Sequence, residues 1–133
     1  MLFDVVIPKE GKIKLIIAGS TSFKDHVLLT KETDKFIRSI GVTNVEVLSS
    51  NENGASIIGK YCANHFNHDC TILEADWVKN GKSAEYDRDV ELVEMADACI
   101  VFWDGLDKTT LNLINICKRN NLKLKIIEYD KGN

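Results

Sequence analysis

The chain lacks the motifs that mark the best-known phosphate-binding and metal-binding sites. Neither GxGxxG nor GxxxxGK[ST] occurs, so it carries neither the dinucleotide fingerprint nor the P-loop. Its four cysteines form no CxxC pair, and the spacing of Cys62, His65, His68 and Cys70 matches no standard zinc pattern. We therefore expect no metal site and no bound cofactor, with the cysteines reduced.

Long apolar runs and clusters of basic residues are absent too. No apolar run approaches the roughly 20 residues that cross a bilayer, and no signal-peptide pattern is visible. The net charge is −3, without a basic cluster of the kind that follows a nucleic-acid backbone. These features predict a cytoplasmic protein that binds neither membranes nor nucleic-acid polymers.

Short apolar segments alternate with segments of helical spacing along the 133 residues, the length of one domain. Strands are predicted at residues 12–18, 45–48 and 71–73, over the run that ends at Phe102, and at 124–128. Helices are predicted at 25–40, 55–66, 86–96 and 109–120, with a loop over 78–84. Residues 2–7 are a candidate edge strand that Pro8 ends. The alternation predicts one Rossmann-like α/β domain, with about five mainly parallel strands and helices on both faces.

Small, polar and tryptophan residues follow four of these strands. In open α/β sheets the ligand lies outside the carboxyl ends of the strands, so we expect a site there. A tryptophan at a strand end offers a stacking surface or a core plug, and glycine and serine also serve ordinary turns. Asp76 and Asp104 are weak candidates for acid–base groups. The expected ligand-binding residues are Gly19, Ser20, Thr21, Ser50, Gly54, Asp76, Trp77, Lys82, Arg88, Trp103, Asp104, Gly105, Thr109 and Thr110.

A family resemblance runs through the same residues. The order of several short motifs resembles the YspA-type branch of the SLOG superfamily. These motifs are Gly19-Ser20-x-x-Phe23-x-Asp25, Gly54-Ala55, Ala75-Asp76-Trp77-x-x-x-Gly81-Lys82-x-Ala84, Arg88, Met95-Ala96-Asp97-Ala98, Phe102-Trp103-Asp104-Gly105 and Thr110. The match covers roughly residues 13–128. It implies a Rossmann-like fold related to lysine-decarboxylase-like proteins, and a nucleotide-derived ligand at the strand ends. This branch is common in bacteria and phages.

The chain departs from the family pattern around the expected phosphate. Thr21 replaces an arginine, and residues 50–56 replace a loop that carries another arginine. That loop gains Glu52, and an Arg-Asn pair becomes Arg88-Asp89. Fewer cations and more acids predict weaker anion binding.

Three functions remain open from the sequence. The first is binding or sensing of a nucleotide-derived small ligand less charged than the family's usual one. The second is hydrolysis of an N-glycosidic bond, as in the phosphoribohydrolase relatives, although their Gly-Gly-x-Gly-Thr-x-x-Glu loop is missing here. The third is a degenerate, non-catalytic protein-interaction module. Small domains of this kind often associate, so a homodimer is one expectation.

Overall fold

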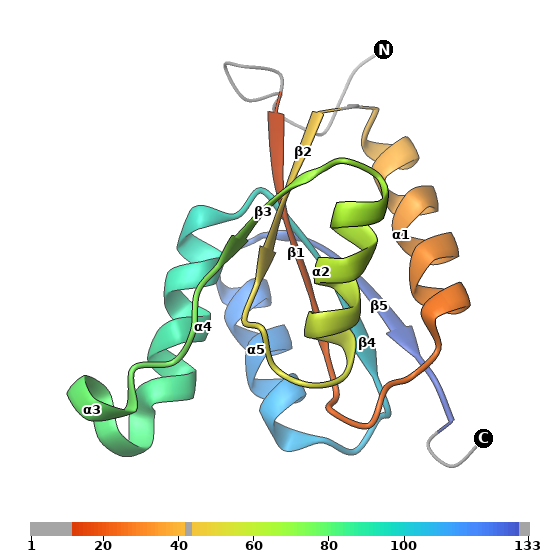
Figure 1. The fold of residues 1–133 in the computed structure, drawn as a ribbon. Helices are drawn as coiled ribbons and strands as arrows, with labels where there is room; N and C mark the ends of the chain where they lie inside the picture. Colours follow the sequence, from red (N-terminus) through yellow and green to blue (C-terminus); the bar gives the residue numbers. More distant parts are fainter. Residues whose placement is uncertain (1–11, 42–43, 131–133) are drawn as a thin grey trace.

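The structure, a computed structural model, describes residues 12–41 and 44–130, and in these ranges five strands form one parallel sheet (Figure 1). The strands are β1 (Lys12–Gly19), β2 (Asn44–Ser49), β3 (Asp69–Ile72), β4 (Ala98–Trp103) and β5 (Lys123–Glu128). Their order across the sheet is β3-β2-β1-β4-β5. This is the order of the first five strands of a Rossmann sheet, whose topological switch point lies between β1 and β4.

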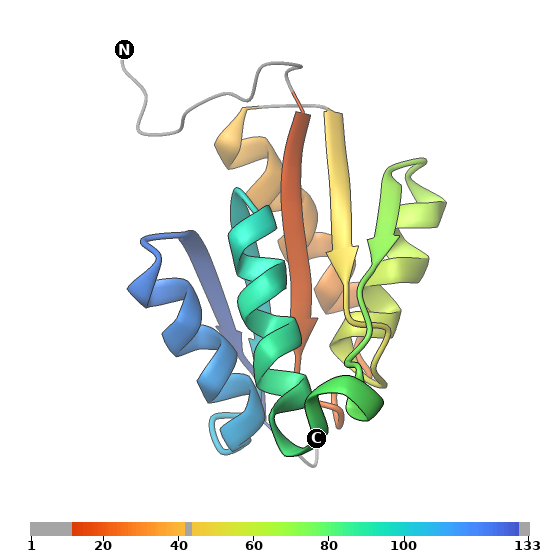
Figure 2. The ribbon, with the colours of Figure 1, turned by 90° about the vertical axis from the view of Figure 1, so that its left-hand side faces the viewer.

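Helices cover both faces of the sheet. α1 (His26–Ile40) and α2 (Ala55–His65) lie on one face, and α4 (Ala84–Met95) and α5 (Lys108–Arg119) on the other (Figures 1 and 2). Alternate side chains of β4 serve the two layers, with Phe102 packing toward α1 and α2 and Val101 toward α4 and α5. The central strands are thus buried on both sides, as in other parallel sheets.

Local capping explains where the first helix starts and stops. The Asp25 carboxylate accepts a hydrogen bond from the Leu28 amide at 2.9 Å, which satisfies a first-turn N–H of α1. Gly41 ends the helix in the left-handed conformation, at φ 87°, and its amide bonds back to the Ile37 carbonyl. Both ends therefore agree with the helix predicted over 25–40.

The predicted fold class is confirmed, and one segment differs. The predicted loop at 78–84 contains a short helix, α3 (Trp77–Asn80), and a 3₁₀ turn over Gly81–Ser83. Asp76 causes this, because its side chain accepts the Lys79 amide at 3.0 Å and starts α3. The candidate edge strand at 2–7 lies outside the described residues. Among the described helices, none has the length and apolar character needed to cross a membrane.

Candidate functional site

A cavity of about 140 Å³ lies at the carboxyl ends of the strands, beside the switch point between β1 and β4. β1 contributes Gly19, the loop after β2 contributes Ser50 and Glu52, and the start of α5 contributes Thr110. α4 closes another side with Arg88 and further residues. The cavity is therefore built from four chain segments, in the position where open α/β sheets bind their ligands. Its described lining residues are Ile16, Ala18, Gly19, Thr21, Ser50, Glu52, Ser56, Glu85, Arg88, Asp89, Leu92, Asp107, Thr109, Thr110 and Leu113.

Arg88 is the basic side chain of this lining, and two carboxylates bind it. Its Nε donates to Asp89 Oδ1 at 2.9 Å, and Nη2 donates to Glu52 Oε1 at 3.3 Å. The Arg88 side chain is 3% exposed and that of Asp89 is 8% exposed, so solvent screens the pair weakly. Glu52 and Asp89 are the acids in which the sequence departs from the family pattern. Both of these acids thus pair with the guanidinium of Arg88.

Burial and neighbouring charges shift the acid–base behaviour of this cluster. Burial raises the pKa of Asp89 to about 6, and the attraction of Arg88 only partly opposes that effect. A hydrogen bond with Glu52 raises the pKa of the Glu85 carboxyl, and burial adds to it. Burial lowers the pKa of Arg88, but Asp89 and Glu52 outweigh it and the net shift is upward. Arg88 therefore stays charged while Asp89 titrates near neutral pH.

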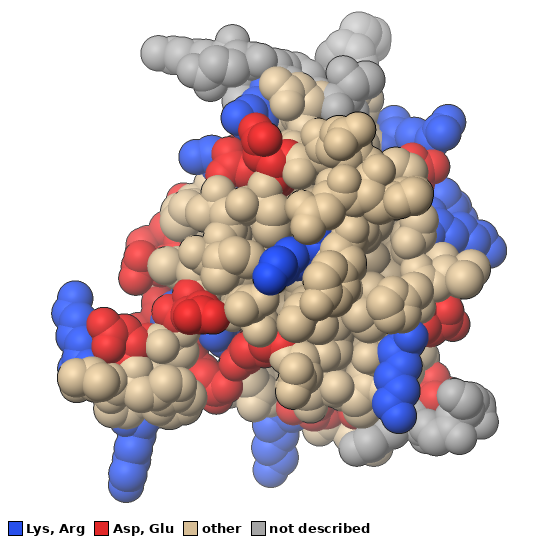
Figure 3. Space-filling view, viewed as in Figure 1, with Lys and Arg blue, Asp and Glu red and all other residues tan. Residues whose placement is uncertain are grey.

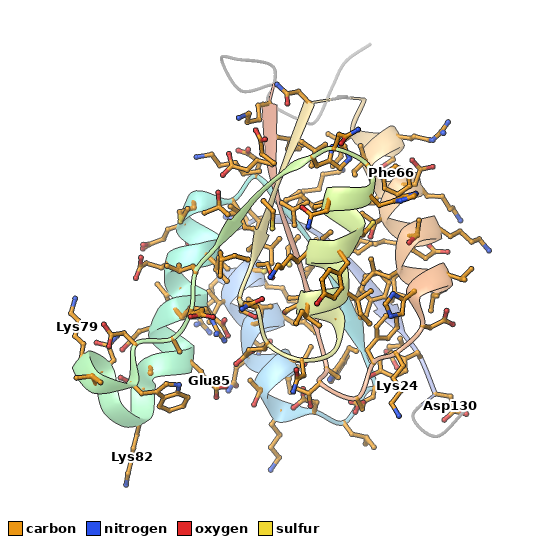
Figure 4. The ribbon with its side chains drawn as sticks, viewed as in Figure 1. Lys24, Phe66, Lys79, Lys82, Glu85 and Asp130 are labelled. Atoms are coloured by element: carbon orange, nitrogen blue, oxygen red, sulfur yellow. The ribbon has the colours of Figure 1, made fainter. Side chains whose placement is uncertain are left out.

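Acidic groups outnumber the cation around the cavity. Glu52, Glu85, Asp89 and Asp107 face one arginine among the described lining residues. In Figure 3 red acidic side chains gather over α4 at the lower left. In Figure 4 Glu85 lies on the inner side of α4, whereas Lys79 and Lys82 point away from the body of the molecule. The cavity thus favours uncharged hydrogen-bond donors over a dense anion.

A hydroxyl network forms the side of the site next to α5. Thr110 Oγ1 donates to Asp107 Oδ2 at 2.5 Å and lies 3.4 Å from the hydroxyl of Ser20. The same Ser20 hydroxyl accepts from the Asp104 amide at 3.3 Å. Ser20 is 1% exposed and does not belong to the described lining, so it supports Thr110 from behind. These contacts hold the loop after β1 against the loop after β4.

Gly19 and Gly54 allow close backbone approaches beneath the site. A Cβ on Gly19, at φ 154°, would lie 2.1 Å from the Phe102 carbonyl oxygen. A Cβ on Gly54, at φ 84°, would lie 2.3 Å from the Ser20 carbonyl oxygen. Glycine is needed at both positions because backbone, not a flexible side chain, fills the space. The sequence associated these glycines with the ligand, and the structure gives them a role in joining the loops.

The first turn of α2 also faces this region. Asp25, Asp76 and Asp107 cap α1, α3 and α5, but α2 begins at Gly54 with no side-chain cap from the described residues. Ser56, in that first turn, lines the cavity. Its hydroxyl accepts from Ser50 Oγ at 3.0 Å, which ties the β2–α2 loop to the helix. Backbone N–H groups at such a start can donate to a ligand oxygen.

Trp103, Asp104 and Gly105, at the end of β4, serve the fold rather than the cavity. Trp103 packs with the α4 and α5 layer, and its indole Nε1 donates to the Asp107 carbonyl at 3.0 Å. Asp104 Oδ1 accepts the amides of Leu106 and Asp107 at 2.9 and 2.8 Å. Gly105 makes the turn between Asp104 and Leu106, at φ 81°. A stacking role for Trp103 and a catalytic role for Asp104 therefore lack support, because these side chains build the β4–α5 loop.

The residues predicted after β3 lie away from the cavity lining as well. Trp77 is 56% exposed on α3, and Asp76 caps that helix. Lys82 is exposed in the 3₁₀ turn and points outward (Figure 4). The crossover after β3 projects past the sheet edge, so its first residues do not reach the switch point. Neither tryptophan lines the cavity.

Six of the predicted ligand residues do line the cavity, and several others were missed. The six are Gly19, Thr21, Ser50, Arg88, Thr109 and Thr110. The sequence prediction looked at residues that directly follow the strands, so it could not identify Glu85 and Asp89, which reach the cavity from the start and the middle of α4. Glu52 and Asp89 stand out in the sequence as departures from the pattern of the superfamily that it resembles, and that signal could have identified them.

The comparisons with known proteins add no relative. No protein-family model, no curated protein and no solved structure matches this chain. The resemblance to the SLOG superfamily therefore stays a prediction, and the function rests on the site's own geometry.

Proposed function

We propose that the carboxyl-end cavity binds a nucleoside, or the nucleoside part of a nucleotide-derived ligand, through uncharged ring and hydroxyl groups. The observation that carries this proposal is the double pairing of Arg88, with Glu52 and Asp89, inside a cavity at the switch point. The position is the usual ligand site of the architecture. The charge pattern determines which part of a nucleotide it accepts.

The size of the cavity supports one ring. Its 140 Å³ is close to the roughly 150 Å³ of a cavity that holds a benzene-sized molecule, and smaller than the roughly 300–1,000 Å³ of pockets that enclose a whole ligand. A nucleobase or a ribose fits such a volume. The remainder of a nucleotide then lies outside, over the loops at the ends of β1 and β2.

The polar groups of the lining match a nucleoside. Ribose hydroxyls and exocyclic amines donate hydrogen bonds, and the carboxylates of Glu52 and Asp107 are acceptors. The first turn of α2 provides backbone amides for ring nitrogens or carbonyl oxygens, and the Thr110 hydroxyl, which donates to Asp107, can accept a hydrogen bond from the ligand. A phosphate needs several donors with positive charge, and Arg88 already spends two of its N–H groups on carboxylates.

Amide chemical-shift mapping by NMR tests the proposal directly. We expect at least one of the four ribonucleosides to shift the amides of Gly19, Ser50, Ser56 and Thr110 in a saturable way. A cyclic dinucleotide is included as a more highly charged probe, and we expect it to bind more weakly.

A pair of surface variants controls for nonspecific effects. Thr21 is exposed at the cavity, so Thr21→Tyr should block entry without disturbing the core. Lys24→Tyr adds the same ring at an exposed position outside the lining and should bind like the parent. Absence of saturable shifts with every nucleoside, or equal binding by the Thr21→Tyr variant, contradicts the proposal.

One observation favours hydrolysis of an N-glycosidic bond as a second candidate. The Asp89 pKa of about 6 suits a general acid near neutral pH. In this reaction the Asp89 carboxyl protonates the departing base as the glycosidic C–N bond breaks, and a second carboxylate such as Glu52 stabilises the positive ribosyl group. Water then adds to the sugar and returns its proton to the Asp89 carboxylate. Chromatography of ribonucleosides and their monophosphates after incubation checks this. Release of free base that Asp89→Asn abolishes supports turnover, and no release leaves binding alone.

A further inference from the structure

A second cavity, of about 370 Å³, lies on the opposite face of the sheet, between α1 and α2. Its floor is formed by Ile17 of β1 and Val47 of β2, both 1% exposed. None of its described lining residues also lines the carboxyl-end cavity. The cavity opens to solvent at a rim that includes Phe66, which is 45% exposed, so a small molecule has access to it.

Small side chains and one outward-facing ring leave the space open. Thr30, Thr33 and Ala63 present little volume where α1 and α2 face each other. Phe66 remains 45% exposed at the end of α2, with its ring stacked on His68 at 6.3 Å between centroids. In Figure 4 Phe66 lies at the rim, between α2 and α1. The ring therefore borders the cavity instead of filling it.

One buried polar group in the wall has no hydrogen-bond partner within the part of the chain that the structure describes. Thr33 is 3% exposed and lines the cavity, and its hydroxyl has no hydrogen-bond partner among the described residues. A buried hydroxyl without a partner is unfavourable and uncommon in folded proteins. A threonine in a helix has two accessible rotamers, so its hydroxyl can turn toward a ligand.

The rest of the lining excludes a strongly charged ligand. Asp34 and Arg38 are the charged residues of the described lining, and they already pair with each other at 2.8 Å between Arg38 Nε and Asp34 Oδ2. Burial raises the pKa of the Cys62 thiol, which keeps that wall uncharged as well. Apart from the hydroxyls of Thr30 and Thr33, the other described walls are apolar or aromatic, and the volume lies within the range of small-molecule pockets.

From these observations we propose that the cavity between α1 and α2 is a binding site for a small, uncharged, largely apolar molecule with one hydrogen-bonding group. The apolar body packs on Ile17, Val47 and Phe66. The polar group bonds to the Thr33 hydroxyl. The proposal is independent of the function proposed for the carboxyl-end cavity.

A pair of probes of the same shape separates the hydrogen bond from simple apolar binding. The probes are 1-naphthol and 1-methylnaphthalene, titrated against the full chain and followed by amide chemical shifts in NMR. We expect saturable shifts at Thr33, Ile37 and Ala63 with both probes, and about tenfold tighter binding of the naphthol because of its added hydrogen bond. The carboxyl-end amides should not respond.

Two conservative variants test the role of Thr33. Thr33→Val keeps the side-chain shape and should bring the two affinities together, whereas Thr33→Ser keeps the hydroxyl and should preserve the preference for naphthol. Both should fold, because neither adds volume to the core. Absence of shifts in α1 and α2, equal affinities in the parent chain, or an unchanged preference in Thr33→Val overturns the proposal.

Discussion

The titration of Asp89 gives the sharpest quantitative prediction. Its pKa is about 6 in the folded protein, against an ordinary value of 3.8. A raised pKa in the folded state means that the Asp89 contribution to stability is complete below about pH 3.8 and is lost as the pH rises through 6. The shift of about 2 pKa units corresponds to roughly 3 kcal/mol, since one unit is about 1.4 kcal/mol.

Substitution by asparagine isolates this contribution. Asp89→Asn keeps a side-chain oxygen that can accept from Arg88 Nε, but it cannot titrate. Urea unfolding of the parent and the variant, from pH 4 to pH 8, measures the difference in unfolding free energy at each pH. We expect the parent to lose roughly 2–3 kcal/mol relative to the variant across that range, with the steepest change near pH 5, midway between the unfolded and folded pKa values.

An exposed acid supplies the control. Asp34 pairs with Arg38 on the surface, where their side chains are 49% and 79% exposed. Asp34→Asn should change the unfolding free energy by less than about 1 kcal/mol at every pH, because exposed pairs contribute little. A parent-to-Asp89→Asn difference that stays constant with pH, or that grows in favour of the parent as the pH rises, would refute the reasoning about burial.

Three further changes probe other parts of the structure. Gly19→Ala places a Cβ against the Phe102 carbonyl and should cost roughly 2–4 kcal/mol in urea unfolding. Gly41→Ala meets no described atom within 4 Å and should cost only about 1–2 kcal/mol for its positive φ. Equal costs would contradict the close approach of β1 and β4. Asp104→Ala removes the acceptor for two loop amides and should lower the unfolding free energy by about 1–2 kcal/mol. It should change nucleoside affinity, measured by calorimetry, less than about twofold. A complete loss of binding would show that Asp104 does contribute to the ligand site. Thr33→Val removes a buried hydroxyl without a described partner and should raise the unfolding free energy by about 1 kcal/mol, and a marked decrease would indicate a partner that the geometry does not contain.

The fold was predictable because its signals are local. Runs such as residues 12–18 and 45–48 are short and apolar, and the segments between them repeat at helical spacing. The exception is the region after β3. There a single Asp76 cap is enough to turn a predicted loop into a short helix. Tryptophan at residue 77 suggested a pocket wall, but nothing in its spacing fixes which way α3 projects.

The candidate site was only partly predictable because its chemistry depends on contacts between distant segments. Arg88 was expected among the ligand-binding residues, and in the structure Glu52, 36 residues earlier in the chain, pairs with it. Only the packing of α4 beside the β2–α2 loop brings them together. Trp103 illustrates a signal that was available. Side chains alternate along a strand, so Trp103 shares the face of Val101, which packs toward α4 and α5.

The central claim is that the carboxylates of Glu52 and Asp89 neutralise the charge of Arg88, so that the cavity binds uncharged groups better than phosphate. Calorimetric titration of each ribonucleoside and its 5′-monophosphate, in the parent chain and in the Glu52→Gln/Asp89→Asn double variant, tests it most directly. We predict that the nucleoside binds more tightly than its monophosphate to the parent. The double variant should reverse the order, with monophosphate affinity rising about tenfold or more as Arg88 gains free charge. A parent chain that already prefers the monophosphate, with the same preference in the double variant, would contradict the account.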